Sequence, residues 1–299
     1  MLGRLKKCEL CPRKCRVNRL EGEIGYCRAG LEAKVALASL HYWEEPCISG
    51  TKGSGTVFFS HCNLRCLFCQ NYQISQHGTG QEVAIARLSQ IFLEQQDRQA
   101  HNLNLVTPVH YVPQIIAGLE LARSNGFRLP VVYNTNSYET VETIRSLAGY
   151  VDVYLPDLKY YDDRYAIIYS GAPDYFAQAT RAIEEMVSQV GTPRFDENGL
   201  IQKGVIIRHL ALPGLLEDSK RIIEYVHHTF GNSVYFSLMN QYTPMFRAQE
   251  RPEINQPLHP TDYEALIDYA LSLGVENGFI QEDDTSSVLF VPKFDLRGV

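Results

Sequence analysis

The stretch GTVFFSHCNLRCLFCQN (residues 55–71) joins an apolar run to three closely spaced cysteines. The run TVFFS is rich in β-branched and aromatic residues, which predicts a buried strand over residues 56–60. Cys62, Cys66 and Cys69 follow it with the spacing C-x3-C-x2-C. So short a loop can wrap one compact cluster, and cysteine thiolates are the ligands that iron–sulfur clusters take. Three ligands on a four-iron cube leave one iron with an open position, so the spacing predicts a cluster that binds a further ligand.

Short apolar runs continue beyond this segment and alternate with helical patterns. The runs are mostly continuous in hydrophobicity, as expected of strands that are buried on both faces of a parallel sheet. The predicted strands after the first cover residues 103–106, 130–134, 151–155, 204–210 and 234–238. The predicted helices cover residues 83–98, 111–125, 138–148, 173–190 and 217–230. A last helix is expected to begin with a capping box, Thr261-x-x-Glu264, and to stop at Gly274.

Six consecutive β-then-α units predict an α/β fold, because right-handed crossovers wind such units into a parallel sheet with helices outside. The number suits an incomplete (β/α)6 barrel, and an open doubly wound sheet is the structural alternative. In either architecture the active site is expected at the carboxyl ends of the strands.

The composition indicates a globular chain that keeps its thiols reduced. Hydrophobic residues make up 45% and charged residues 21% of the 299 residues, so a core can be buried. No run of about 18 apolar residues is present, and no apolar stretch follows the basic start as in a secretory signal. We therefore expect a cytoplasmic protein without a membrane partner. All eight cysteines lie within residues 8–69, which in a reducing compartment indicates metal binding rather than disulfide bonds.

A second group of cysteines lies near the N-terminus. Cys8, Cys11, Cys15 and Cys27 have the spacing C-x2-C-x3-C-x11-C. Four thiolates suit a structural zinc ion and an auxiliary [4Fe–4S] cluster equally well, and the sequence does not choose between them.

Residues 1–50 do not fit the β/α series, since they contain many charges and one strand-like run, 35–40. We therefore predict a cysteine-rich, metal-binding extension over 1–50, and the partial barrel with a C-terminal segment over 51–299. Residues 1–19 carry seven basic side chains against one acidic side chain. We interpret these cations as offsetting the cysteine thiolates, with a partner or RNA surface as the alternative. The net charge of −6 argues against a nucleic-acid partner for the whole chain.

The cysteine segment resembles the radical SAM superfamily motif C-x3-C-x-aromatic-C, in which Phe68 takes the aromatic position. Zinc sites prefer paired C-x2–4-C knuckles with four ligands, so this spacing favours the cluster. The resemblance implies that Cys62, Cys66 and Cys69 hold a [4Fe–4S] cluster whose open iron binds the amino and carboxylate groups of S-adenosylmethionine (SAM). In that superfamily an electron from the reduced cluster cleaves SAM, and the deoxyadenosyl radical abstracts a hydrogen atom. The cofactor supplies this chemistry, while the protein positions it and excludes water.

The core from residue 55 to about 245 resembles the activating enzymes of glycyl radical enzymes, such as the pyruvate formate-lyase activating enzyme. The whole chain resembles a branch described as pyruvate formate-lyase activating enzyme-like. This resemblance implies a protein or peptide substrate and an electron donor such as flavodoxin or ferredoxin. One alternative is a radical SAM enzyme that modifies a small molecule or RNA. Another is a non-catalytic iron–sulfur or zinc protein, although an electron carrier would require four cysteines on each cluster.

The resemblance also implies SAM contacts at the strand ends. The run LPDLK (155–159) matches the Leu-Asp-Leu-Lys pattern of the family, and IRHLALPG (207–214) resembles its Ile-Arg-Tyr pattern. The methionine end of SAM is a zwitterion, and a buried zwitterion requires paired counter-charges. An ordinary ion-pair network is the alternative interpretation of these charges. The expected SAM contacts are Phe68, Asn71, Thr107, Pro108, Asn134, Asn136, Asp157, Lys159 and Arg208. No residue is assigned a catalytic role.

Two positions depart from the pattern of the family. Asn134 replaces an aspartate in the Leu-Asp-Thr-Asn-Gly run, which weakens the expected ionic contact with the SAM ammonium group. Thr107 and Pro108 stand where the family has Gly-Gly-Glu, and proline has no N–H to donate. We therefore expect SAM recognition to differ in detail at the end of the second strand.

Overall fold

Ten strands form one sheet in the computed structural model of this chain, which describes residues 1–281 and 291–299. The strand order is β10-β9-β8-β6-β5-β4-β2-β1-β3, and β7 pairs with β8 beside this path. The strands are β1 (Ala33–His41), β2 (Ser54–Phe59), β3 (Gln81–Val83), β4 (Leu103–Val106), β5 (Val131–Thr135), β6 (Val153–Pro156), β7 (Arg194–Phe195), β8 (Ile201–Leu210), β9 (Tyr235–Met239) and β10 (Gly278–Ile280).

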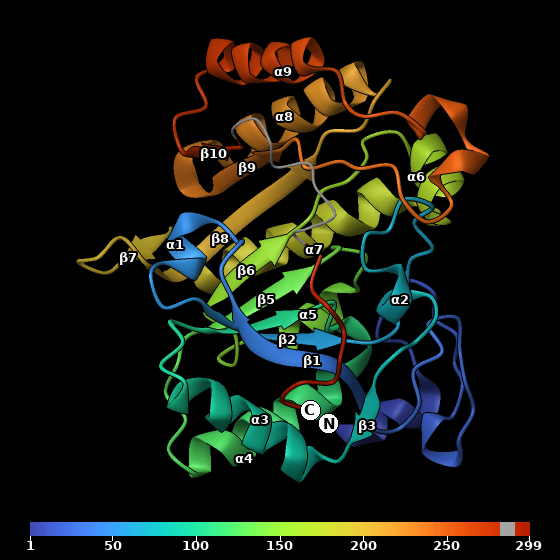
Figure 1. The fold of residues 1–299 in the computed structure, drawn as a ribbon, viewed down its shortest axis with the longest axis vertical. Coiled ribbons are helices and arrows are strands. Elements are labelled where there is room, and N and C mark those ends of the chain that lie inside the picture. The colour runs from blue at the N-terminus through green and yellow to red at the C-terminus, as the bar shows by residue number, and fades with distance from the viewer. Residues whose placement is uncertain (282–290) are drawn as a thin grey trace.

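Helices surround this sheet, with α3 and α4 packed together at one end and α8 and α9 at the other (Figure 1). The helices are α1 (Pro46–Ser49), α2 (Tyr72–Ser75), α3 (Ile85–Asp97), α4 (Val112–Ser124), α5 (Val141–Arg145), α6 (Asp163–Ser170), α7 (Tyr175–Val190), α8 (Leu216–Phe230) and α9 (Pro260–Leu273). None of the helices in the described ranges is both long and apolar enough to cross a membrane.

The six predicted strands correspond to β2, β4, β5, β6, β8 and β9, and they pair in parallel in this order. Every residue of β2, β4, β5 and β6 is buried, as the continuous apolar runs predicted. The sheet ends at β3 on one side and at β10 on the other, so it is open rather than closed. The predicted α/β fold with an incomplete barrel is therefore confirmed.

Close packing between β2 and α3 depends on Gly55. A Cβ atom at this position would lie 2.6 Å from the Cβ atom of Gln95 and 2.9 Å from the carbonyl oxygen of Asn102. The missing side chain lets α3 approach the first parallel strand, which fixes the strand directly before the cysteine loop.

Several short elements and one strand pairing were not predicted from the sequence. The short strands β3 and β10 extend the sheet at its edges. The strand-like run at 35–40 is part of β1, which pairs antiparallel with both β2 and β3. The division into 1–50 and 51–299 stays a prediction, although β1 joins the first segment to the sheet.

The prediction that a capping box at Thr261 begins the last helix is wrong. The helix α9 begins at Pro260, and its N-cap is His259, whose side chain accepts a hydrogen bond from the Thr261 amide. Proline is favoured at the first helical position because it has no N–H to satisfy, so the helix begins one residue before the predicted cap.

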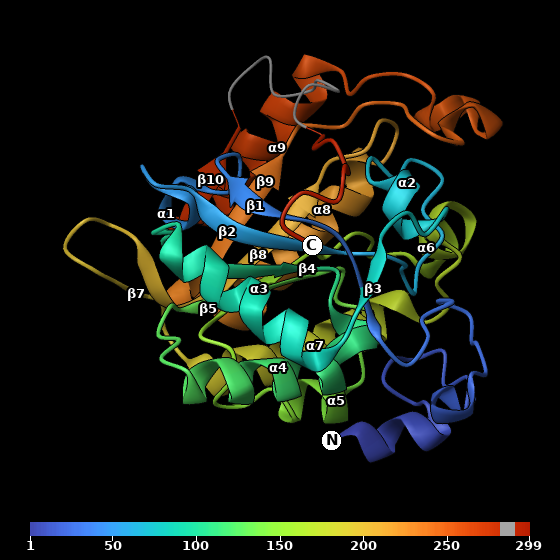
Figure 2. The same cartoon turned by 60° about the horizontal axis from the view of Figure 1, so that its bottom comes forward.

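The N-terminal segment is mostly irregular and packs beside β3, on the same side as α2 and α6 (Figures 1 and 2). It contains two short 3-10 helices, Leu2–Lys7 and Arg19–Glu21. Leu10 and Arg19 are buried, and the Arg19 guanidinium donates a 2.6 Å hydrogen bond to the carbonyl oxygen of His110. Side-chain contacts with the barrel therefore hold this segment in place.

Candidate functional site

A cavity of about 350 Å³ lies at the carboxyl ends of the parallel strands. The loop after β2 and the ends of β4, β5, β6, β8 and β9 all contribute to its wall, as expected for this fold. The predicted site residues that line it are Cys62, Cys66, Phe68, Cys69, Asn71, Thr107, Asn134, Asn136, Asp157, Lys159 and Arg208. Pro108 is not among the lining residues, and it instead caps the 3-10 turn Val109–Tyr111.

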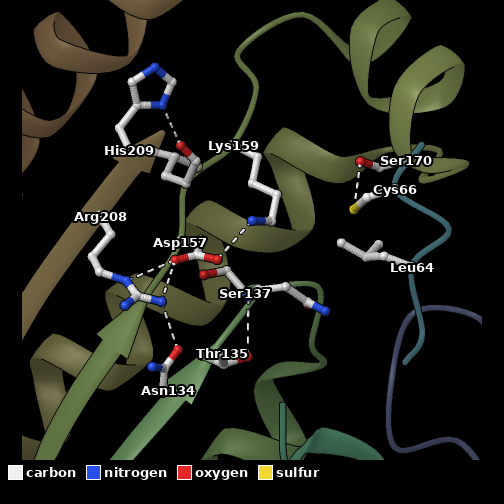
Figure 3. A network of polar contacts seen from close by, with 12 residues as sticks. Leu64, Cys66, Asn134, Thr135, Ser137, Asp157, Lys159, Ser170, Arg208 and His209 are labelled. Carbon is white, nitrogen blue, oxygen red and sulfur yellow. Dashed lines mark hydrogen bonds and ion pairs between the residues drawn. The ribbon is translucent and has the colours of Figure 1, made fainter. Parts of the chain in front are cut away.

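Each of the three loop cysteines has a hydrogen-bonding partner at its sulfur atom. The Leu64 amide and the Asn136 side chain both donate to Cys62 Sγ at 3.4 Å. Ser170 Oγ donates to Cys66 Sγ at 3.0 Å, as Figure 3 shows. The Sγ atom of Cys69 lies 3.1 Å from Ser75 Oγ. Hydrogen bonds to sulfur stabilise thiolates and tune the potential of iron–sulfur clusters.

Burial keeps these thiols protonated when nothing is bound. Burial, together with the neighbouring Cys66, raises the pKa of Cys62 to about 12 and that of Cys69 to about 11. All eight cysteines of the chain are free of disulfide bonds. A metal binds thiolates, so binding here would have to release protons from the loop.

The donor set fits a cluster with three thiolate ligands. In the part of the chain that the structure describes, no three His, Cys, Asp or Glu side chains converge as the ligands of one metal ion do. A four-iron cube holds its cysteine sulfurs further apart than one ion would. The three loop thiols instead border one cavity that also contains polar and charged groups for a further ligand.

A network of charges lies in the same cavity and faces Cys66 (Figure 3). The Asp157 carboxylate is 2.7 Å from Lys159 Nζ and 2.8 Å from the Arg208 guanidinium. Arg208 also donates a 2.7 Å hydrogen bond to Asn134 Oδ1. Only 13% to 16% of the Asp157, Lys159 and Arg208 side chains is exposed. Asp157 and Arg208 lie side by side in a parallel bridge, which fixes their relative position.

All three groups of this network are charged at neutral pH. Burial opposes the ionisation of Asp157, but Arg208 and Lys159 outweigh it and hold the pKa of the carboxyl below its usual value. Burial also opposes the charge on Lys159, and Asp157 outweighs it, so the pKa of the ammonium group is raised. The cavity wall thus offers one buried anion between two buried cations.

Glu44 completes the network, and sequence reasoning missed it. Its carboxylate is 3.0 Å from the Arg208 guanidinium and accepts 3.1 Å hydrogen bonds from the side chains of Asn104 and Asn134. The residue lies between β1 and α1, far in sequence from the strand-end motifs. The one available signal was the acidic pair Glu44-Glu45 a few residues after the strand-like run 35–40.

The backbone at the end of β4 adopts a left-handed conformation. Thr107 has a φ of 56°, and its amide donates a 2.9 Å hydrogen bond to the Asn134 carbonyl. Ser137, at the corresponding end of β5, has a φ of 63°. Non-glycine residues in this region are strained by roughly 1–3 kcal/mol, and such strain gathers at functional sites. Thr107 therefore holds a conformation that a glycine would adopt freely, at the position where the family pattern has glycine.

Met239 and Gln241 also line the cavity, at the end of β9. The Gln241 carbonyl accepts a 3.0 Å hydrogen bond from the Gln70 side chain, which ties this strand end to the cysteine loop. Trp43 lines the cavity too and is 65% exposed, so the cavity reaches solvent beside it.

The radical SAM superfamily model matches residues 56–226. This chain belongs to the radical SAM superfamily. Members of this family use a [4Fe–4S] cluster and SAM, so the chain is related to enzymes that perform radical chemistry. An uncharacterized protein of Methanocaldococcus jannaschii, MJ0674, is 32% identical over 277 residues, which cover 89% of this chain and 74% of that protein.

Solved structures were also found that are similar to part of this chain. The maturase HydG of Carboxydothermus hydrogenoformans superposes with a TM-score of 0.50 at 11% identity, over 77% of this chain and 54% of that one. SuiB of Streptococcus suis, with SAM bound, has a TM-score of 0.49 at 17% identity, over 75% of this chain and 49% of that one. The chain spans about half the length of these solved structures.

Proposed function

We propose that this chain is a radical SAM enzyme whose Cys62, Cys66 and Cys69 hold a [4Fe–4S] cluster. When bound together, the cluster and SAM supply reductive cleavage of the sulfonium and a deoxyadenosyl radical. The observation that carries the proposal is one cavity with three hydrogen-bonded thiols on one wall and a buried charge network on the opposite wall. Because three thiolates leave one iron of the cluster without a protein ligand, SAM can bind that iron from the side of the charge network.

The charge network is suited to the methionine end of SAM. Asp157 is the acid for the ammonium group, and Lys159 and Arg208 are the bases for the carboxylate. Glu44 pairs with Arg208 as well, so the two acids balance the two bases of the network before SAM arrives. Asn134 adds an amide group to the charged wall, where it accepts a hydrogen bond from Arg208, and Asn136 adds one beside the cysteines, where it donates to Cys62 Sγ. Phe68, Asn71 and Thr107 provide the remaining contacts on the loop side and at the end of β4.

The substrate class we propose is a protein or peptide, as in the activating enzymes that the core resembles. The cavity supports it because it reaches solvent beside the exposed Trp43, where a segment of another chain can lie. In this role the radical is passed to the partner, so the chain itself needs no catalytic acid or base. An electron donor of the flavodoxin or ferredoxin class would reduce the cluster.

The test is anaerobic reconstitution with iron and sulfide, followed by SAM and dithionite. Formation of 5′-deoxyadenosine is the expected result. An intact, reduced cluster that yields no such product would refute the proposal. Deuterium transfer from labelled candidate peptides into 5′-deoxyadenosine then separates a peptide substrate from a small molecule or RNA.

A further inference from the structure

Positive charge is concentrated in the first residues of the chain. Residues 1–19 carry seven basic side chains and one acidic side chain, a net charge of +6. The whole chain carries −6, so residues 20–299 carry −12. An asymmetry of this size directs an approaching acidic protein toward the N-terminal segment, because the summed field of the charges acts before any contact forms.

Some of these cations lie against the N-terminal cysteines and others do not. Arg13, Lys14 and Arg19 border the space among those cysteines, and Arg19 is buried. Lys6 and Lys7 do not border it and are exposed. The ion pairs of the described residues include neither lysine. The charge of Lys6 and Lys7 is therefore presented to solvent.

The N-terminal segment is attached to the cysteine loop of the SAM site. Arg13 donates a 3.0 Å hydrogen bond to the Asn63 carbonyl, and its guanidinium lies 3.8 Å from the centre of the Tyr26 ring. Arg65, from the loop, donates to the Cys62 carbonyl at 2.8 Å and lies 4.4 Å from the centre of the same ring. These contacts hold the segment beside the backbone that carries Cys62.

The same segment also contacts the end of α6, which supports Cys66. Ser170 is the last residue of α6, and its Oγ atom donates to Cys66 Sγ. Gly171 follows it, and the carbonyl oxygen of this glycine accepts a hydrogen bond from Arg13. A Cβ atom at Gly171 would lie 3.2 Å from Tyr26 Oη. A protein that docks on the N-terminal segment is thereby brought close to the cysteine loop (Figures 1 and 2).

We propose that the exposed, basic face of residues 1–19 is the docking surface for an acidic protein that delivers one electron to the SAM-binding cluster. Lys6 and Lys7 supply charge that attracts the carrier, and complexes for electron transfer bury less than about 1,200 Å², so a short segment provides enough surface. One electron passes from the carrier to the cluster, so the carrier is oxidised and the cluster reduced, and no bond forms or breaks. The proposal rests on the proposed function in one respect, the cluster held by the loop.

RNA is another anionic partner that a basic segment can bind, and the charge of the remaining chain disfavours it. A nucleic-acid surface spreads its cations along the path of many phosphates. Here the net positive charge is confined to residues 1–19, and the net charge of −12 on the other residues repels an extended strand.

Reversal of the two exposed charges tests the docking surface. In the double variant Lys6→Glu, Lys7→Glu, stopped-flow reduction of the cluster by reduced flavodoxin should slow by about tenfold or more at about 0.01 M ionic strength, where the Debye length is about 30 Å. At about 1 M the Debye length falls to about 3 Å, and the rate should approach that of the unsubstituted chain. The rate of reduction by dithionite, measured on the same sample, is the reference for the state of the cluster.

The matched control is the double variant Lys52→Glu, Arg181→Glu, which changes the net charge equally at two exposed cations outside the N-terminal segment. Its rate with flavodoxin should stay within about twofold of that of the unsubstituted chain. Equal slowing in the two double variants, or no slowing in the variant of Lys6 and Lys7, overturns the docking surface. Loss of binding to a labelled single-stranded RNA in that variant, with an unchanged flavodoxin rate, overturns it in favour of RNA.

Reduction of the cluster is followed by its visible absorbance and requires no SAM. A chain whose cluster is reduced by flavodoxin in the charge-dependent way, but that forms no 5′-deoxyadenosine with SAM, supports the docking surface and contradicts the proposed function. A chain that assembles no cluster overturns both.

Discussion

The two cysteine-rich regions differ in how many thiols they offer and in how much space those thiols face. The loop after β2 presents three thiols to a cavity of about 350 Å³ with a charged far wall. The N-terminal segment presents four thiols to a space of about 20 Å³. The first arrangement can accommodate a substrate beside a metal cluster, whereas the second space is little larger than one water molecule.

The two groups of cysteines are also held in place in different ways. The loop follows a fully buried strand, so the fold itself places its sulfurs at the strand ends. The N-terminal segment has little regular structure and depends on contacts such as that of Arg19 with His110. Metal binding is therefore expected to stabilise the fold of the N-terminal segment more than that of the loop.

The largest expected effect is on 5′-deoxyadenosine formation, which should depend on the cysteines of the loop and much less on those of the N-terminal segment. Cys66→Ser should reduce 5′-deoxyadenosine formation with dithionite to the background level, because two thiolates cannot hold the cluster. Cys11→Ser should retain most of this activity, since dithionite reduces the SAM-binding cluster directly. Cys47→Ala is the control for a buried cysteine in neither region. Equal losses of 5′-deoxyadenosine formation in Cys66→Ser and Cys11→Ser would show that the two groups of cysteines do not have separate roles.

The next effect concerns the paired acids and bases of the large cavity, since the residues that line the N-terminal space include three cations and no acid. Arg208→Gln should weaken SAM binding by about a hundredfold, near 3 kcal/mol, because it removes the cation that pairs with both Asp157 and Glu44 and leaves Asp157 with Lys159 alone. Arg208→Lys should recover part of the affinity. Arg145→Gln removes an exposed ion pair with Glu185 and should change stability by about 1 kcal/mol or less. Equilibrium binding of SAM to the reconstituted chain measures the affinities, and equal affinity in the Arg208 variants contradicts the assignment.

A third effect depends on pH and concerns a buried carboxyl group that contacts β5, one of the strands whose ends line the cavity. Glu139 is fully buried and accepts hydrogen bonds from Tyr133 and Thr135, on the strand that carries Asn134. Burial raises its pKa to about 7, above an unfolded value of about 4.3. The folded chain therefore binds this proton more tightly than the unfolded chain does. The stabilising contribution is full below about pH 4.3 and declines as the pH rises to 7.

Urea unfolding of the unsubstituted chain and of Glu139→Gln at pH 5 and pH 7.5 measures this contribution. Glutamine cannot ionise, so the stability of the unsubstituted chain relative to the variant should fall by about 3 kcal/mol between the two pH values. A difference that stays constant with pH would show that the carboxyl group is ionised throughout.

The smallest effect concerns the contact between the two regions. Tyr26→Ala removes a ring that faces the guanidinium groups of Arg13 and Arg65, and should lower the free energy of unfolding by about 1–2 kcal/mol. Limited proteolysis should then cut the N-terminal segment faster. Tyr26→Phe retains the ring and should behave like the unsubstituted chain. Equal proteolysis of Tyr26→Ala and Tyr26→Phe would indicate that the two regions do not depend on this ring.

The parallel strands could be predicted because burial on both faces requires continuous apolar runs, which are visible in the sequence. The strand-end residues could be predicted for a related reason, since parallel strands bring their carboxyl ends to one edge of the sheet. Asp157 and Arg208 are 51 residues apart in the chain, yet their side chains meet at that edge.

Other features could not be predicted because their causes are not local. Glu44 joins the site only because β1 pairs with β2 and places the following residues beside β8. The strands β3 and β10 have three residues each, too few for a periodic pattern. Pro108 was assigned to the site by its place in the motif, but it is the N-cap of the 3-10 turn Val109–Tyr111 and does not line the cavity.

The pairing of β1 with β2 has a practical consequence for dissecting this protein. A truncated chain that begins at residue 51 would lack β1, so the hydrogen-bonding edge of β2 would be bare and available to a second molecule. The same cut would remove the carboxylate of Glu44 and leave Arg208 with one anionic neighbour fewer. We expect such a fragment to self-associate in solution, which size-exclusion chromatography of the fragment and the intact chain would detect.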